Sequence, residues 1–360
     1  MLSRAVRTPV ASVAARSLHS SAAAQAKVCV IGGGGGIGQP MSMLLSMNPQ
    51  VSHVAVFDMV GAPGVGVDLS HIDTPSKVTG HGMSLAEFTG DNKIDNQAEF
   101  QAKAMDEALA GCDVVVIPAG VPRKPGMTRQ DLFAVNAKLN ADFADAVARN
   151  CPKAFVAIIS NPVNSTVPIF AEQMKKNGCF DARRVFGVTS LDLVRARTFV
   201  AEAAGVDVNT LSIPVVGGHA GKSILPLLSQ ATPSVLDKLT QAQVEALTTR
   251  IQNGGTEVVN AKAGAGSATL SMAKAGAYFA DSIIRAMKGE KGIVECTFVQ
   301  SDVTECSWFA TRIELGVNGV EKNLGIGKIN DFESKKLAEA IAELKPSITE
   351  GVEYVTKAKL

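Results

Sequence analysis

Short apolar runs alternate with longer segments of helical periodicity through the first half of the chain. Five of these runs are expected to be strands, at 27–31, 53–57, 113–117, 154–159 and 184–186. Helical patterns lie between them, among others at 130–149 and 164–177. Continuous apolar runs are typical of strands that are buried on both faces. Their alternation with helices predicts a parallel, doubly wound α/β sheet from Lys27 to about Gly187.

The pattern changes after Gly187. The expected elements are a helix at 191–204, an apolar β-rich run at 209–216, long helices at 234–263 and 267–287, strands at 293–300, 308–315 and 319–323, and a final helix at 331–357 that is interrupted near Pro346. Because strands and helices no longer alternate regularly, this half is expected to be α+β. We therefore predict one domain over 26–187 and a second over 188–360.

The first 25 residues differ in composition from the rest of the chain. Their only charges are three arginines, Ser and Ala are abundant, and no acidic residue appears before Asp58. This composition is typical of an organelle transit peptide, since a secretory signal would need a continuous apolar stretch. The segment 16–21 resembles a mitochondrial processing region, with cleavage near 22–26, and indicates the mitochondrial matrix. A plastid and a disordered tail are the weaker alternatives.

Charge and cysteine usage exclude several classes of protein. The composition is 46% hydrophobic and 19% charged, with a formal net charge of +1. This balance gives no indication of a nucleic-acid or membrane partner, and no apolar run approaches the roughly 20 residues of a membrane span. The six cysteines are scattered singly without a Cys-x-x-Cys. We therefore expect no metal site and no disulfide framework, but free thiols in a reducing compartment.

The first expected strand runs directly into a glycine-rich loop. The loop reads Gly32, Gly33, Gly34, Gly35, Gly36, Ile37 and Gly38, and a helix is expected to start near Gln39. Glycines between a strand and a helix allow a tight turn and the close approach of a pyrophosphate, which the helix N-terminus attracts. This context predicts a dinucleotide-binding Rossmann domain, although a run of five glycines is unusual.

Asp58 closes the next expected strand, twenty residues after Gly38. A carboxylate at this position accepts hydrogen bonds from the adenosine ribose. The same charge would repel a 2′-phosphate, so NAD is favoured over NADP. An ordinary helix N-cap or loop acid is the alternative reading of Asp58.

One histidine of five stands in surroundings that suit catalysis. His219 follows an apolar strand pattern and is flanked by glycines, which leave room for a ligand. Neutral imidazole can take a proton from an alcohol near neutral pH. Asp192 and Arg195 share a helix face elsewhere in the chain, and could orient the imidazole and clamp a carboxylate. A solvated histidine and a plain helix salt bridge are the alternatives, while His53, His71 and His81 have no obvious partner.

Two further polar positions follow expected strands. Arg123 and Arg129 lie on a proline- and glycine-rich loop after the 113–117 run. Arginine grips carboxylates with two hydrogen bonds, so this loop suggests a small anionic substrate, with a solvated basic loop as the alternative. Asn161 closes the 154–159 run, where an amide can orient substrate and cofactor, or simply form a turn before Pro162.

These segments together resemble the lactate/malate dehydrogenase family, and most closely its mitochondrial-type malate dehydrogenase branch. The matching motifs are Gly-Gly-Ile-Gly-Gln-Pro at 35–40, Pro-Gly-Val-Gly-Val-Asp-Leu-Ser-His-Ile at 63–72, Ala-Gly-Val-Pro-Arg-Lys-Pro-Gly-Met-Thr-Arg at 119–129, and Ser-Asn-Pro-Val-Asn at 160–164. Segments 190–198 and 215–226 match as well. The resemblance extends in order over residues 27 to 357.

The resemblance implies a role for each candidate residue. His219 would exchange the substrate proton with Asp192 as its partner, Arg195 would bind the carboxylate beside the reacting carbon, Arg123 would bind the distal carboxylate with help from Arg129, and Asn161 would bind the substrate oxygen. NAD contacts would fall on Gly32 to Gly38, Asp58, Asn136, Ile159, Ser160, Asn161 and Met272. The implied substrates are malate and oxaloacetate, and the implied assembly is a homodimer. Another 2-hydroxy acid such as lactate, and a non-catalytic dinucleotide-binding protein, are the alternatives.

One segment departs from the family pattern. Residues 82–103 make the chain longer than usual between His81 and Ala108, and they are polar and charged. We expect a surface excursion outside the site motifs.

Overall fold

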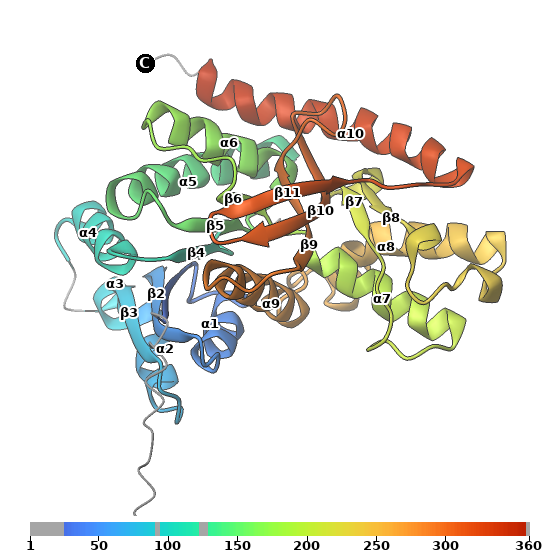
Figure 1. Cartoon of the computed structure of the whole chain (residues 1–360). Coiled ribbons are helices and arrows are strands. Elements are labelled where there is room, and N and C mark those ends of the chain that lie inside the picture. The colour runs from blue at the N-terminus through green and yellow to red at the C-terminus, as the bar shows by residue number, and fades with distance from the viewer. Residues whose placement is uncertain (1–24, 91–93, 122–128, 358–360) are drawn as a thin grey trace, which may run out of the picture.

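The structure is a computed structural model that describes residues 25–90, 94–121 and 129–357 (Figure 1). The strands are β1 (Ala26–Ile31), β2 (Val51–Val60), β3 (Lys77–Met83), β4 (Val114–Ile117), β5 (Phe155–Ile158), β6 (Val185–Gly187), β7 (Val215–Gly217), β8 (Ile224–Pro226), β9 (Ile293–Gln300), β10 (Trp308–Gly316) and β11 (Gly319–Gly325). The α-helices are α1 (Gly38–Ser46), α2 (Ala62–Ser70), α3 (Leu85–Thr89), α4 (Gln97–Leu109), α5 (Arg129–Asn150), α6 (Val163–Lys176), α7 (Ser190–Ala204), α8 (Gln241–Ala261), α9 (Leu270–Met287) and α10 (Asp331–Thr356). Short 3₁₀ turns lie at Gly221–Ser223, Leu228–Gln230 and Leu236–Lys238. The predicted transit peptide lies outside the described residues.

A single mixed sheet runs through the molecule. Its first six strands are parallel, in the order β3-β2-β1-β4-β5-β6, and the sheet continues through the antiparallel strands β9, β10, β7 and β8, with β11 paired to β10. The parallel order 3-2-1-4-5-6 is that of a dinucleotide-binding, doubly wound fold. The predicted fold class, a Rossmann sheet followed by an α+β half, is confirmed.

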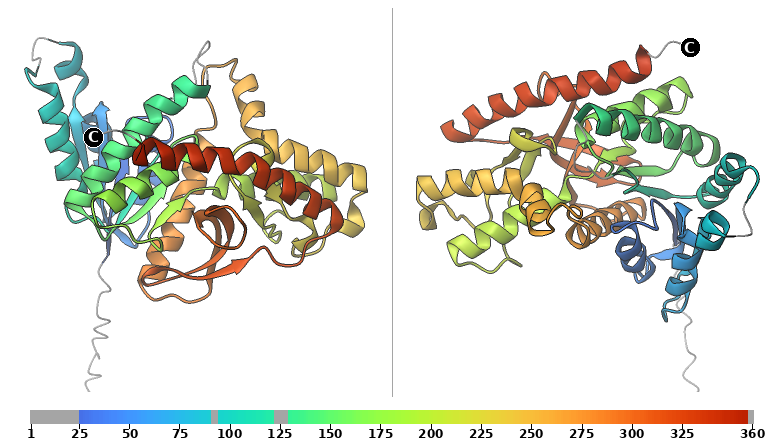
Figure 2. Two further views of the ribbon diagram at one scale, coloured as in Figure 1. Left: turned by 90° about the horizontal axis from the view of Figure 1, so that it is seen from above. Right: turned by 180° about the vertical axis from the view of Figure 1, so that it is seen from behind.

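The inner parallel strands are buried on both faces because their side chains alternate between two cores. On β1, Cys29 and Ile31 belong to a core covered by α4, α5, α6 and α10. Val28 and Val30 of the same strand belong to a core covered by α1 and α9. Figures 1 and 2 show these two groups of helices on opposite sides of the sheet, with α10 lying along α6. Such two-sided burial explains why the sequence shows continuous apolar runs rather than alternation.

The second half differs from the expected pattern in three places. The apolar run 209–216 is mostly loop, and only its end enters β7. The helix expected from 234 begins at Gln241, because the Thr240 hydroxyl accepts the Gln243 N–H and the Gln243 side chain accepts the Thr240 N–H. This capping box fixes a helix start and can be read from the sequence. The last helix runs through Pro346 without a break, and α6 packs along it.

Residues 82–103 are not merely an excursion from the surface. Met83 at the end of β3 is buried, α3 carries its own capping box at Ser84, and α4 begins inside the segment. Phe100 packs on the core, and the Gln101 amide donates to the Met59 carbonyl. The expected surface segment is therefore partly anchored to the sheet edge, and its residues 91–93 lie outside the described part.

The edge of the sheet carries a histidine pair that sequence reasoning left without partners. Nε2 of His53 lies 2.8 Å from the Thr79 hydroxyl, and Nε2 of His81 lies 2.9 Å from the same oxygen. Glu107 of α4 approaches Nδ1 of His81 at 3.9 Å. Burial, helped by the charges of Lys27 and Lys77, lowers the pKa of His53 to about 4, and burial also lowers the pKa of His81.

This pair is expected to make the protein less stable in acid. Between pH 6.5 and 4 the unfolded chain binds a proton at His53 that the folded chain does not, so the free energy of unfolding falls as pH falls. Because the ring is partly exposed, we expect a contribution of about 1 kcal/mol. Urea unfolding of the wild type and of His53→Gln at pH 7.5 and pH 4.5 measures it. The wild type should lose more stability than the variant, and equal losses would contradict this role of His53.

Candidate active site

The glycine loop joins β1 to α1 at the carboxyl edge of the parallel strands. Gly32 has a φ of +96°, and the N–H groups of Gly32 and Gly33 both donate to the Phe57 carbonyl at 2.8 Å. A Cβ on Gly38 would lie 2.1 Å from the Gly32 carbonyl oxygen, so only glycine permits this close approach of helix and strand. No side chain caps the N-terminus of α1. Because the Gln39 N–H already donates to the Gly35 carbonyl, the positive end of the helix dipole is the feature of α1 that suits a pyrophosphate.

Asp58 lies beside this loop near the end of β2. Its Oδ2 accepts the Gly34 N–H at 2.9 Å, and its Oδ1 accepts the Met59 N–H at 2.8 Å. Burial raises the pKa of Asp58 above its ordinary value, against the opposing effect of these backbone donors. The structure thus brings the predicted ribose ligand into contact with the predicted pyrophosphate loop.

The predicted catalytic residues meet although they are far apart in the sequence. Nδ1 of His219, on the loop after β7, lies 2.5 Å from Oδ2 of Asp192 in the first turn of α7. Asp192 is fully buried, and its Oδ1 lies 3.4 Å from the Arg195 guanidinium one turn later. A buried carboxylate on one imidazole nitrogen fixes the tautomer and leaves the other nitrogen, Nε2, for proton transfer.

Three polar residues tie together the loops that follow β4 and β5. The buried Asn136 of α5 donates from Nδ2 to the Asn161 carbonyl at 2.8 Å and accepts the Val121 N–H at 2.8 Å. The Ser160 hydroxyl is directed to the carbonyls of Ile117 and Ala119. Asn161 itself is exposed and precedes a cis peptide bond to Pro162. Asn136 and Ser160 therefore support the strand ends, and Asn161 is the one of the three that faces the cavity.

These residues surround a cavity of about 780 Å³. Its walls contain the predicted residues Ile37, Ile159, Asn161, Asp192, Arg195, His219 and Met272. They also contain residues that sequence reasoning missed, among them Gln252 and Thr256 of α8 and the loop residues Ser267 and Ala268. The glycines at 264 and 266, between the helices expected at 234–263 and 267–287, were a sequence signal for this loop. The cavity joins the end of the glycine loop to the His219–Asp192 pair.

Two residues that were predicted to bind the substrate have side chains outside the described part of the chain. Arg123 lies outside the described residues. Arg129 is the first residue of α5, and its side chain also lies outside the described part. The start of α5 nevertheless follows the loop after β4, and Asn136 of this helix donates to the Asn161 carbonyl just after β5.

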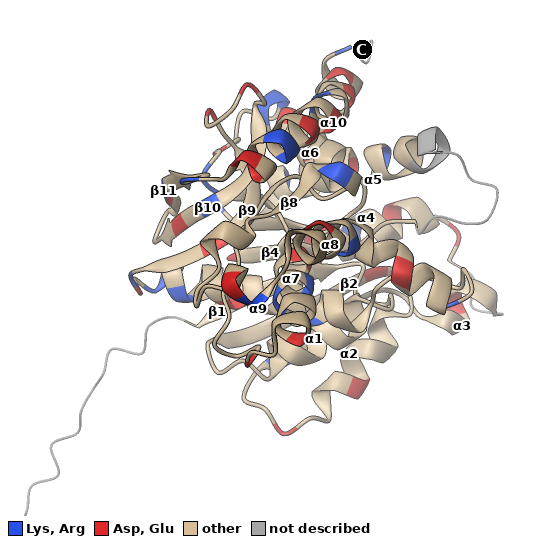
Figure 3. Cartoon of the chain, turned by 90° about the vertical axis from the view of Figure 1, so that its right-hand side faces the viewer, with Lys and Arg blue, Asp and Glu red and all other residues tan. Residues whose placement is uncertain are grey.

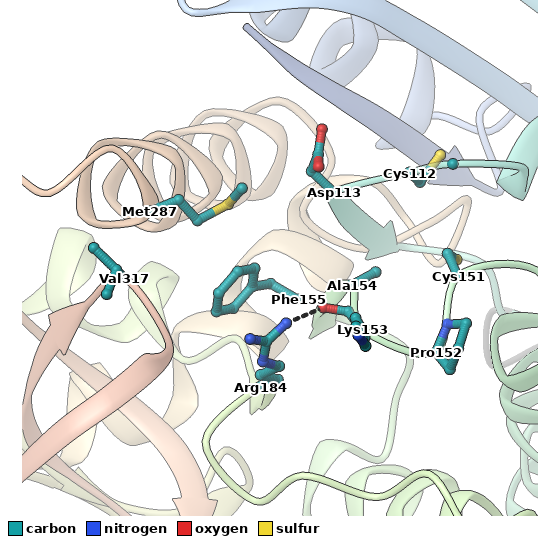
Figure 4. A pocket seen from close by; sticks show the side chains of 11 residues that line it. Cys112, Asp113, Cys151, Pro152, Lys153, Ala154, Phe155, Arg184, Met287 and Val317 are labelled. Atoms are coloured by element: carbon teal, nitrogen blue, oxygen red, sulfur yellow. Dashed lines mark hydrogen bonds between the residues drawn. The ribbon is translucent and has the colours of Figure 1, made fainter. Parts of the chain in front are cut away.

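A smaller cavity of about 470 Å³ lies at the opposite edge of the sheet (Figure 4). Asp113, Phe155 and Arg184 line it just before or at the starts of β4, β5 and β6. The Arg184 guanidinium is 4.9 Å from the centre of the Phe155 ring and donates to the Lys153 carbonyl. Burial raises the pKa of Cys151 to about 12, so this thiol stays protonated and a poor nucleophile. The residues that line the smaller cavity include no histidine, whereas His219 lines the larger one.

Neither a metal centre nor a membrane span is found in the described part of the chain. No group of three or more His, Cys, Asp or Glu side chains there could hold a metal ion. None of its helices is both long and apolar enough to cross a bilayer. In the view onto α7 and α8, acidic and basic residues are interspersed (Figure 3).

Comparison with known proteins agrees with the geometry. The NAD-binding domain of the lactate/malate dehydrogenases matches residues 26–94 and 82–187, and the alpha/beta C-terminal domain of the same family matches residues 189–355. The two N-terminal matches overlap at 82–94, inside the segment that departs from the family pattern.

Individual relatives cover the whole chain. Rat "Malate dehydrogenase, mitochondrial" is 53% identical over 359 residues, which is 100% of both chains. A crystal structure of Cryptosporidium parvum malate dehydrogenase is 29% identical, with a TM-score of 0.74, and the match covers 91% of this chain and 99% of that one. A lactate dehydrogenase of the same organism, solved with lactic acid and nicotinamide adenine dinucleotide, is 25% identical with a TM-score of 0.75, over 93% and 99% of the two chains. The chain belongs to the lactate/malate dehydrogenase family.

Proposed function

We propose that the chain is an NAD-dependent malate dehydrogenase, which interconverts (S)-malate and oxaloacetate in the tricarboxylic acid cycle. The observation that carries the proposal is the His219–Asp192–Arg195 cluster in the wall of a cavity that Ile37, from the glycine loop, also lines. The 53% identity to a mitochondrial malate dehydrogenase over the full chain favours malate among the substrates of the family.

The residues around the glycine loop fit the dinucleotide. The uncapped N-terminus of α1 suits the pyrophosphate and Asp58 suits the ribose of NAD. Ile37, Ile159 and Met272 give the cavity apolar walls on the side of α1 and α9. When bound, NAD would supply the hydride chemistry at C2 of malate.

The chain's own residues would handle the proton and the carboxylates. In malate oxidation, Nε2 of His219 takes the hydroxyl proton, and Asp192 stabilises the imidazolium that forms. Arg195 holds the carboxylate next to the reacting carbon, and Asn161 holds the substrate oxygen. In the reverse direction the protonated His219 donates to the oxaloacetate carbonyl. These roles give a function to both charged side chains of the cavity lining, Asp192 and Arg195.

Selectivity for a second acid group is assigned to Arg123, with help from Arg129. Lactate has no distal carboxylate, and a desolvated guanidinium without a partner costs several kcal/mol. A dinucleotide-binding protein without catalysis would have no use for a buried carboxylate that grips His219 at 2.5 Å. Both alternatives are therefore less well supported.

Location, processing and assembly complete the proposal. The relatives are named mitochondrial, and the composition of residues 1–25 supports a transit peptide, so we place the protein in the mitochondrial matrix. We place the NAD-binding domain at 26–187 and the catalytic domain at 188–360. A homodimer is supported by exposed apolar side chains on or next to α1, α2 and α9, and α1 contacts both of the other helices. These side chains are Met43, Met47, Val67, Leu270 and Tyr278.

One assay tests the activity and its substrate. Protein without residues 1–25 is given NADH with either oxaloacetate or pyruvate, and absorbance of NADH is followed. We expect kcat/KM for oxaloacetate to exceed that for pyruvate by at least about 10³, because pyruvate leaves a guanidinium unpaired. A preference for pyruvate would refute the malate assignment. Turnover of neither substrate, with NADH still bound, would favour the non-catalytic alternative.

A further inference from the structure

The loop that carries His219 is folded around one buried hydroxyl. Ser223 lies just before β8 and is fully buried. Its Oγ donates to the Ala220 carbonyl at 2.5 Å and accepts the Ala220 N–H at 3.1 Å. The amide of Asn164 donates to the same oxygen at 3.2 Å. One donor and two acceptor positions are thus all used, which is the full capacity of a hydroxyl.

Asn164 connects this hydroxyl to the backbone of His219. Its side chain is buried in the first turn of α6, and its Oδ1 accepts the His219 N–H at 2.8 Å while its Nδ2 donates to Ser223. Gly218 makes the contact possible, because a Cβ there would lie 2.7 Å from both Asn164 Oδ1 and Ser223 Oγ. Asn161, which lies just before this helix, lines the cavity. The start of α6 therefore places one side chain in the cavity wall and another against the backbone of His219.

We infer that Asn164 is a positioning residue for His219, and that it acts together with Ser223. Asp192 fixes the imidazole ring through Nδ1, whereas Asn164 fixes the backbone from which the ring extends. The inference rests on the proposed function, because it assigns a second support to the same proton acceptor. Without Asn164 the His219 N–H is left buried and unpaired, so the loop shifts until water or another group satisfies it. A displacement of about 1 Å at a catalytic group costs roughly 10²-fold in rate.

The experiment compares four variants: Asn164→Ala, Ser223→Ala, Ser223→Thr and Gln173→Ala. For Asn164→Ala we expect kcat with malate to fall about 10- to 100-fold, while KM and the Kd for NADH change less than about threefold. Ser223→Ala should lose about tenfold in kcat, and Ser223→Thr, which keeps the hydroxyl, should restore most of it.

Gln173→Ala is the matched control. Gln173 lies on the same helix and makes one side-chain hydrogen bond to another helix, at 2.7 Å to Asp145, away from the cavity. We expect it to lower the melting temperature without changing kcat. Wild-type kcat in Asn164→Ala would overturn the inference. Equal kcat in Ser223→Ala and Ser223→Thr would also overturn it. If Asn164→Ala does not fold, the comparison of these two Ser223 variants tests the inference instead. An inactive wild type would instead defeat the proposed function.

Discussion

Replacing His219 by Asn is expected to lower turnover at least about 100-fold while leaving cofactor binding intact. Asn has no group that can accept the hydroxyl proton, and general acid–base catalysis contributes about 10²- to 10⁴-fold. We expect kcat in both directions to fall by that factor. The Kd for NADH, measured by fluorescence titration, should stay within about twofold, since the glycine loop and Asp58 are untouched.

His71→Asn provides the control for this change. His71 is an exposed residue at the C-terminal end of α2, so its loss should leave kcat and NADH affinity at wild-type values. A His219→Asn enzyme with more than about a tenth of wild-type kcat would contradict the role of the imidazole as proton acceptor. In that case another group in the cavity would have to take the proton.

The parts of the fold that local sequence determines were predictable. The strand–loop–helix from Ala26 to Ser46 follows from an apolar run, glycines and a helical pattern, and the structure has all three. The edge strand β3 was not expected, because Lys77, Thr79 and His81 make it polar on its exposed side. Its polarity reflects its place at the sheet edge, which only the tertiary structure defines.

The contact between His219 and Asp192, in contrast, could not be predicted from local sequence. The two residues are 27 positions apart and come from different elements, so neither periodicity nor spacing brings them together. The family resemblance supplied the pairing, and the structure gives its geometry. Asn164 was quoted only as part of a motif, since its two hydrogen bonds reach 55 and 59 residues along the chain. Long-range contacts of this type are invisible to reading one segment at a time.

Arg195→Lys is expected to show whether the substrate carboxylate needs only a positive charge or also the two parallel N–H donors of a guanidinium. Lysine keeps a positive charge near the buried Asp192, which otherwise retains only His219 as a partner. It cannot offer two parallel N–H donors to a carboxylate. We therefore expect kcat/KM for malate to fall about 10²- to 10³-fold, with NADH affinity unchanged.

Arg197→Lys, two residues further along α7, is the matched control for Arg195→Lys. The Arg197 guanidinium donates to the Val208 carbonyl at 3.0 Å and does not line the cavity, so kinetics should remain at wild-type values. Steady-state kinetics with malate at saturating NAD measures both variants. If Arg195→Lys keeps wild-type kcat/KM, the positive charge alone suffices and the two-pronged grip assigned to Arg195 is wrong. If both variants lose activity equally, the loss reflects disruption of α7 and not of the substrate contact. Loss in Arg195→Lys alone is the result that the position of its guanidinium, beside His219 in the cavity wall, leads us to expect.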